Sequence, residues 1–70
     1  MEPTKVAIIT IGDEILYGQT LDTNSHWLSQ ELDSHGFIVT HRATVGDTEK
    51  DILAGLDYAR EQAKVILMTG

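Results

Sequence analysis

Three short apolar runs along the chain have the lengths and compositions of β-strands. Residues 5–11 form a near-continuous run of mostly β-branched side chains, which is typical of a strand buried on both faces of a parallel sheet. Residues 37–45 begin apolar and then alternate with polar positions, so we predict a less buried strand nearer the edge of the sheet. Residues 65–68 are wholly apolar and predict a third, shorter strand.

The segment between the first two runs predicts a helix over residues 23–35. Leu28 and Leu32 are four positions apart, and Gly36 follows where a helix commonly ends in a glycine. We expect Trp27 to pack at the flank of this helix. Asn24 lies one turn before Leu28, so we place its amide on the buried stripe, pointing toward the sheet. A buried amide needs partners, and it would either brace the loop before the helix or contact a ligand.

The segment before the third run predicts a second helix over residues 49–63. Thr48 and Asp51 have the spacing of a capping box. Gly55 within the helix allows close packing against a neighbour. The predicted apolar stripe consists of Ile52, Leu53, Leu56, Ala59 and Ala63.

The predicted order is therefore β-α-β-α-β, an α/β fold in which helices cover a largely parallel sheet. This would be a portion of a three-layer α/β/α sandwich. In open α/β sheets, ligands lie outside the carboxyl ends of the strands. The polar, glycine-marked residues that meet at that edge are Gly12, Asp13 and Glu14 after the first strand, Gly46 and Asp47 after the second, and Thr69 and Gly70 after the third.

Asp13 and Glu14 are the sharpest candidates for chemistry in the chain. Adjacent acids just past a strand end can hold Mg²⁺ through a carboxylate and waters, with phosphate completing the shell. The alternative is a solvated turn in which Asp13 bonds to its own backbone. Residues 12–21 show no clean period, so we expect no regular element there, and residues 15–17 are apolar enough to fold back onto the core. Gly18, further along this loop, predicts a tight turn or a close backbone approach.

Several polar residues at the helix starts allow two interpretations. Asp22 or Thr23 is a good N-cap for the first helix, and capping is the stronger explanation for this pair. Asp47 either caps the second helix or faces the ligand edge while Thr48 caps.

Composition narrows the function classes. The formal charge is −6, with 11 Asp and Glu against 5 Lys and Arg, which argues against a nucleic-acid partner because that needs a basic patch. There is no cysteine among the 70 residues, so disulfides and thiolate chemistry are excluded. No run has the length of a membrane helix and the start lacks a signal peptide, so we expect a cytoplasmic protein without a membrane partner. The common dinucleotide, P-loop and hydrolase motifs are absent.

Three motifs together resemble those of a known family. They are Gly-Asp-Glu-Ile-Leu-x-Gly over residues 12–18, Asp-Thr-Asn-Ser over 22–25 and Thr-Val-Gly-Asp over 44–47. It is the MoaB/MogA/MoeA-type molybdopterin-binding domain, and within it the N-terminal domain of the competence/damage-inducible protein A (CinA) family. The resemblance runs from about Lys5 to Gly70. It implies that residues 1–70 are the first part of a single such domain, with a glycine-rich loop expected beyond Gly70 and, in full-length CinA proteins, an amidase domain.

The resemblance also implies a function. The intact domain would bind a phosphorylated pterin or an adenine nucleotide. Residues 1–70 by themselves are expected to be inactive. CinA-type domains are associated with metal-dependent cleavage of ADP-ribose, and the MogA branch adenylylates molybdopterin. Asp13 and Asp47 would then be catalytic, with Mg²⁺ held by Asp13 and Glu14. The residues expected to bind the substrate are Gly12, Glu14, Gly18, Asp22, Asn24, Ser25, Gly46, Thr69 and Gly70. The alternative is a non-catalytic module for binding or oligomerisation, and a homo-oligomer is expected in either case.

Overall fold

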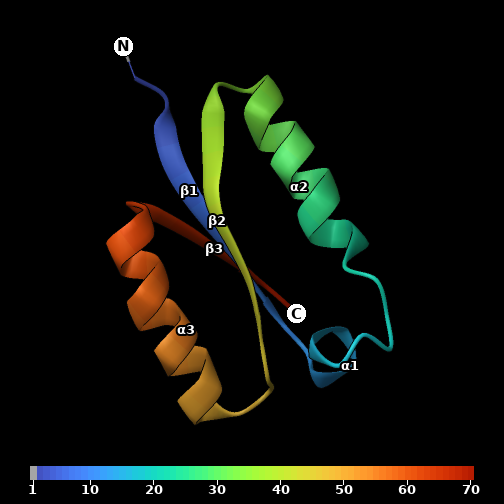
Figure 1. The fold of residues 1–70 in the computed structure, drawn as a ribbon. Coiled ribbons are helices and arrows are strands. Elements are labelled where there is room, and N and C mark those ends of the chain that lie inside the picture. The colour runs from blue at the N-terminus through green and yellow to red at the C-terminus, as the bar shows by residue number, and fades with distance from the viewer. Residues whose placement is uncertain (1) are drawn as a thin grey trace.

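A three-stranded parallel sheet with helices on both faces forms the structure (Figure 1), a computed structural model that describes residues 2–70. Its strand order is β2-β1-β3, so the predicted α/β class and parallel pairing are confirmed. The elements are β1 (Thr4–Ile11), α1 (Asp13–Leu16), α2 (Thr23–Ser34), β2 (Phe37–Val45), α3 (Glu49–Gln62) and β3 (Val65–Thr69).

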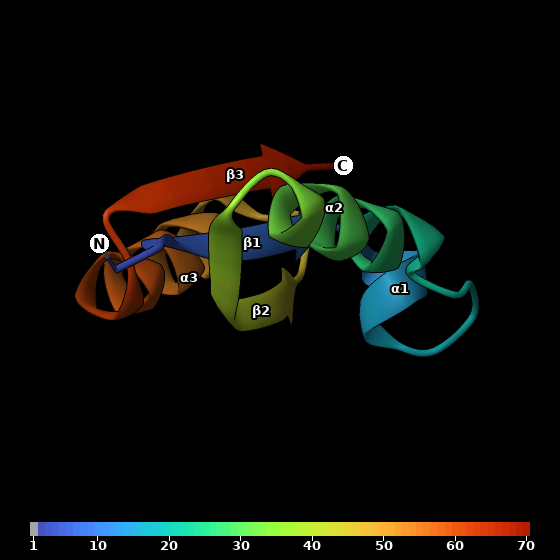
Figure 2. The ribbon, with the colours of Figure 1, turned by 90° about the horizontal axis from the view of Figure 1, so that it is seen from above.

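Strand β1 is the centre of the molecule, lying between β3 and β2 (Figure 2). Every side chain from Val6 to Thr10 is buried, as expected for a strand covered on both faces. By contrast, no residue of β2 is fully buried, and the strand lies at an edge of this sheet. The predicted difference between the two strands is thus confirmed.

Helix α3 covers one face of the sheet, where Ala7 and Ile9 pack with Ala59. It approaches β2 closely, because a Cβ added at Gly55 would lie 2.7 Å from Cγ1 of Val45. Helix α2 lies on the opposite face and packs mainly against β2. Gly36, with a φ of +86°, follows the C-cap of α2 as predicted. Within residues 2–70, none of the helices combines the length and apolar character needed to cross a membrane.

The segment after β1 differs most from the prediction. We expected no regular element there, but residues 13–16 form the short helix α1. Ile15 is half-buried, whereas Tyr17 is 73% exposed and does not fold back onto the core.

Two other apolar side chains are more exposed than their spacing predicts. Leu53 was placed on the buried stripe of α3 but is 50% exposed, and Gly55 takes the inward position instead. Trp27, expected to pack at the flank of α2, is 59% exposed.

Candidate ligand-binding edge

The carboxyl ends of β1 and β2 are joined through Asp13. Its Oδ1 accepts a hydrogen bond of 3.0 Å from the backbone N–H of Asp47. Beside it, the N–H of Gly12 donates to the carbonyl of Val45 over 3.0 Å. The structure therefore brings together the two acids that we proposed as catalytic, and both are exposed at the edge of the sheet.

Two further carboxylates approach this point. Glu14 folds back over Gly12, since a Cβ added there would lie 2.8 Å from Oε1 of Glu14. At Gly46, an added Cβ would lie 2.7 Å from Oδ2 of Asp51 and 3.1 Å from Oδ1 of Asp13. The absence of a Cβ at Gly12 and Gly46 leaves room for these carboxylates beside the backbone.

Asp51 was not among the predicted site residues. Thr48 caps α3 by accepting a hydrogen bond of 3.2 Å from the N–H of Asp51, which resolves the choice between Asp47 and Thr48. The acid of the capping box, however, turns toward Gly46 rather than serving only the cap. The sequence signal was present, because Asp51 is in the first turn of a helix that starts at the ligand edge.

A second set of polar contacts joins the end of β1 to the start of α2. Oγ1 of Thr10 donates to Oδ2 of Asp22 over 2.8 Å, and the hydroxyls of Thr10 and Ser25 are 2.6 Å apart. Oδ1 of Asp22 accepts from the N–H of Ser25 over 3.0 Å, which makes Asp22 the N-cap of α2. Thr10 was missed by the sequence reasoning, although a hydroxyl near the end of an otherwise apolar strand was its signal.

The pKa of Asp22 reflects this environment. Burial by itself raises the pKa of the carboxyl, but hydrogen bonds from Ser25 and Thr10, together with the charge of Arg42, outweigh it. The pKa of Asp22 is therefore lower than that of an ordinary aspartate, because these contacts favour the charged form. Asp22 is a charged structural anchor at neutral pH.

The predicted orientation of Asn24 is wrong. Its side chain is exposed, and the adjacent Ser25, at 3% exposure, takes the inward position. Positions three and four before Leu28 both lie one turn away from it, and Ser25, whose hydroxyl contacts that of Thr10, is the one that faces the sheet. The buried or half-buried stripe of α2 is Ser25, Leu28, Ser29 and Leu32.

The remaining predicted residues divide between the edge and its surroundings. Gly70 lies against the end of β1, where an added Cβ would be 3.5 Å from the carbonyl oxygen of Ile11. Thr69 is half-buried and pairs with Thr10 in the sheet register. Gly18 has a φ of +77° and so makes the predicted tight turn, but it is exposed, and an added Cβ would meet no atom of residues 2–70 within 4 Å.

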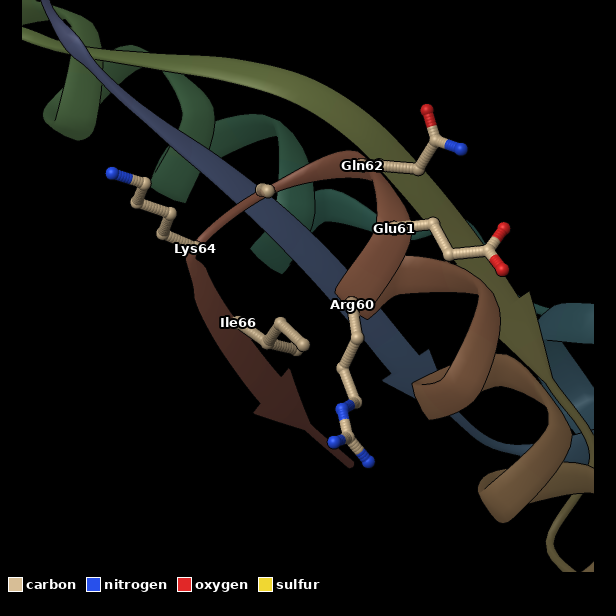
Figure 3. Close-up of a pocket in the computed structure, with 6 residues that line it drawn as sticks. Arg60, Glu61, Gln62, Lys64 and Ile66 are labelled. Atoms are coloured by element: carbon tan, nitrogen blue, oxygen red, sulfur yellow. The ribbon is translucent and has the colours of Figure 1, made fainter.

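A surface hollow accompanies the edge, with Leu16 of α1 and Ala54 of α3 among its lining residues and Gly46 beside Asp51. Within the described chain, no three His, Asp or Glu side chains gather closely enough to form a metal cluster. Another hollow lies at the turn between α3 and β3 (Figure 3), near Arg60, Lys64 and Ile66. It is at the amino end of β3 and contains none of the predicted site residues, so it is separate from the candidate site.

The fold can now be compared with known families of protein domains. The model of a family described as a probable molybdopterin binding domain matches residues 7–70. The chain belongs to this family.

Its relatives specify the branch. A CinA-like protein of Cytophaga hutchinsonii is 48% identical over 63 residues, which are 90% of this chain and 15% of that protein. A CinA-like protein of Salinibacter ruber is 44% identical over 66 residues, 94% of this chain and 16% of that one. The chain thus spans about a sixth of the length of these relatives.

A solved structure agrees with the sequence comparisons. The crystal structure of CinA from Thermoplasma acidophilum, described as a protein of unknown function, superposes with a TM-score of 0.91 and 29% identity. The superposition covers 97% of this chain and 40% of that chain. The chain is therefore CinA-like in sequence and in fold.

Proposed function

We propose that the carboxyl edge of this sheet forms one side of a binding site for the phosphate groups of an adenine nucleotide or a phosphorylated pterin. The observation that carries this proposal is the hydrogen bond between Asp13 and the N–H of Asp47. It gathers acids from two strand ends at the place where α/β sheets bind ligands. The family's description as a probable molybdopterin binding domain supports the same ligand class.

We further propose that the site uses Mg²⁺ to cleave the pyrophosphate of ADP-ribose. Mg²⁺ is commonly bound by one or two carboxylates, with waters and substrate phosphates as the other ligands. Asp13 and Asp51, which both approach Gly46, offer such a pair, and Glu14 folds back over the nearby Gly12. When bound, the metal would supply neutralisation of charge on the phosphates. Asp47 would orient a water that attacks one phosphorus, the bond from that phosphorus to the bridging oxygen would break, and AMP and ribose 5-phosphate would leave.

The acidic edge explains why a cation is part of this proposal. Among residues 2–70, Arg60 forms an ion pair with Asp57 on the exposed side of α3. The carboxylates of Asp13 and Asp51 have no salt-bridge partner among these residues, so a phosphate ligand would meet uncompensated negative charge without a metal.

The test uses the complete domain with ADP-ribose and Mg²⁺, and it measures release of AMP. Asp13→Asn keeps a carbonyl oxygen that can accept from Asp47 but removes the charge, so we expect activity to fall by at least about a hundredfold. Asp33→Asn, an exposed acid on α2, is the matched control and should retain activity.

The alternative is a non-catalytic binding or oligomerisation module in which the acids only cap helices and stabilise turns. It predicts no AMP with any metal, together with a change in molecular mass or a bound pterin. Absence of AMP release by the unmodified protein, or full activity in Asp13→Asn, would overturn the enzymatic proposal and favour this module.

A further inference from the structure

A row of threonines crosses the sheet near the carboxyl ends of its strands. In the register of the sheet, Thr10 of β1 pairs with Thr44 of β2 and with Thr69 of β3. The outer two are half-buried, whereas Thr10 is only 2% exposed. The central hydroxyl of this row therefore has to satisfy its hydrogen bonds within the protein.

The hydrogen bonds of Thr10 have a definite direction. The Asp22 carboxylate is charged and can only accept, so the single hydroxyl proton of Thr10 goes to its Oδ2. The hydroxyl of Ser25 then donates to Oγ1 of Thr10 over 2.6 Å. Thr10 is thus the link between the two α2 residues and the end of β1.

These contacts close a long loop. The chain leaves β1 after Ile11, passes through α1 and returns to the sheet where α2 begins (Figure 1). At that return, Asp22 accepts the hydrogen bond from Thr10. Residues 16–21 are all exposed. The front of the loop is held by Asp13 and Gly12, and its return is held by the bonds of Asp22 to Thr10 and Ser25.

We propose that Thr10 is a positioning residue for the site, which sets the path of the returning half of this loop. This inference rests on the proposed function, because it assumes that the edge beside Asp13 binds a ligand. Since Asp13 is held separately by Asp47, loss of the Thr10 hydroxyl should loosen the loop around the ligand without displacing the front carboxylate.

Hydrogen exchange on the full chain tests the structural half of the proposal. In Thr10→Val, which keeps the β-branched shape, we expect the backbone N–H groups of residues 17–25 to exchange about tenfold faster, because the lost hydrogen bonds contribute on the order of 1 kcal/mol. Thr10→Ser should restore protection. Thr44→Val is the matched control, since its hydroxyl makes no side-chain hydrogen bond within the described chain.

Kinetics test the functional half. With ADP-ribose and Mg²⁺, Thr10→Val should raise KM about tenfold and change kcat by less than about threefold, and Thr10→Ser should reverse the effect on KM. If Thr10→Val folds poorly, Ser25→Ala removes the neighbouring donor without altering β1 and should give the same pattern.

The two proposals fail differently. Unchanged exchange of residues 17–25 in Thr10→Val, or an equal increase throughout β1 and in Thr44→Val, would overturn the role of Thr10. A fall of about tenfold in kcat with an unchanged KM would also overturn the role of Thr10. If the unmodified protein releases no AMP, the proposed reaction fails, while the exchange pattern and the affinity for a pterin phosphate still decide the role of Thr10.

Discussion

The backbone N–H of Asp47 donates to Oδ1 of Asp13 over 3.0 Å, across 34 positions in sequence. This bond ties the first residue of α1 to the turn after β2. It is exposed, so water competes with it and its contribution to stability is modest. Its main consequence is placement, because it fixes a carboxylate beside the N-terminus of α3.

Replacing Asp13 separates the hydrogen bond from the charge. Asp13→Ala removes the acceptor and should lower the free energy of unfolding by about 0.5–1.5 kcal/mol. Asp13→Asn keeps an acceptor and should cost less than half as much. Urea unfolding of the full chain measures both, with Asp33→Ala as the control. Equal losses in the two Asp13 variants would show that the bond to Asp47 contributes nothing to stability.

The behaviour of this pair shows what sequence alone could provide. Parallel topology was enough to bring Asp13 and Asp47 to one edge, because strand ends share an edge whatever their side chains are. It could not show that Asp51 turns toward Gly46, since that depends on a rotamer and on the room left by a missing Cβ. The bounds of the five predicted strands and helices came within one residue, because continuous apolar runs and helical spacing mark them clearly.

Asp22 should make stability sensitive to acid. Its folded-state pKa is lower than its unfolded value, so its charged form stabilises the fold at neutral pH. That stabilisation is complete above the ordinary pKa of an aspartate and is lost as the pH falls through the lowered folded-state pKa. Asp22→Asn can still cap α2 but cannot titrate.

The comparison is made by urea unfolding of the unmodified protein and Asp22→Asn at neutral and acidic pH. At neutral pH we expect Asp22→Asn to have a lower free energy of unfolding than the unmodified protein. This difference should shrink as the pH falls below the ordinary pKa of an aspartate. Asp22→Ala should cost a further amount of about 1 kcal/mol, because the cap itself is lost. A difference that grows on acidification would contradict the assignment.

Asn24 and Ser25 show a limit of prediction from helical spacing. Both lie one turn before Leu28, so helical spacing alone could not choose between them. The choice was made by a contact between distant residues, the hydroxyl pair of Thr10 and Ser25. Periodicity within one helix carries no information about the strand opposite, and the wrong residue was therefore placed inside.

Gly55 offers a test of the packing between α3 and β2. Alanine favours a helix over glycine by about 1 kcal/mol, but its Cβ would lie 2.7 Å from Cγ1 of Val45. Val45 is β-branched and has little rotamer freedom, and overpacking costs about 1–3 kcal/mol. Gly55→Ala should therefore destabilise the protein on balance.

A double-mutant cycle with Val45→Ala checks the cause. Removing the two methyl groups of Val45 makes room for the new Cβ, so the double variant should be more stable than the sum of the two single changes predicts. Unfolding in urea gives all four values. Additive effects, or stabilisation by Gly55→Ala alone, would show that α3 moves away from β2 at little cost.

The two outer edges of the sheet lead to a prediction for the isolated 70-residue chain. Within residues 2–70, β2 and β3 each pair on one side only, with β1. Ile38 on β2 and Met68 on β3 are both 43% exposed. Unpaired edges with apolar side chains recruit further strands, so we expect the isolated chain to associate as its concentration rises.

Sedimentation velocity over a wide concentration range measures this association, and matched lysine substitutions identify the edge responsible. Met68→Lys should suppress association more than Ile38→Lys, because α3 and α2 both contact β2 whereas the flanking cover of β3 comes mainly from α3. Lysine on an edge strand discourages pairing with another chain. Circular dichroism confirms that each variant is folded. A monomer at all concentrations with a cooperative thermal transition would show that the described elements form a self-sufficient unit, and stronger suppression by Ile38→Lys would assign the association to β2.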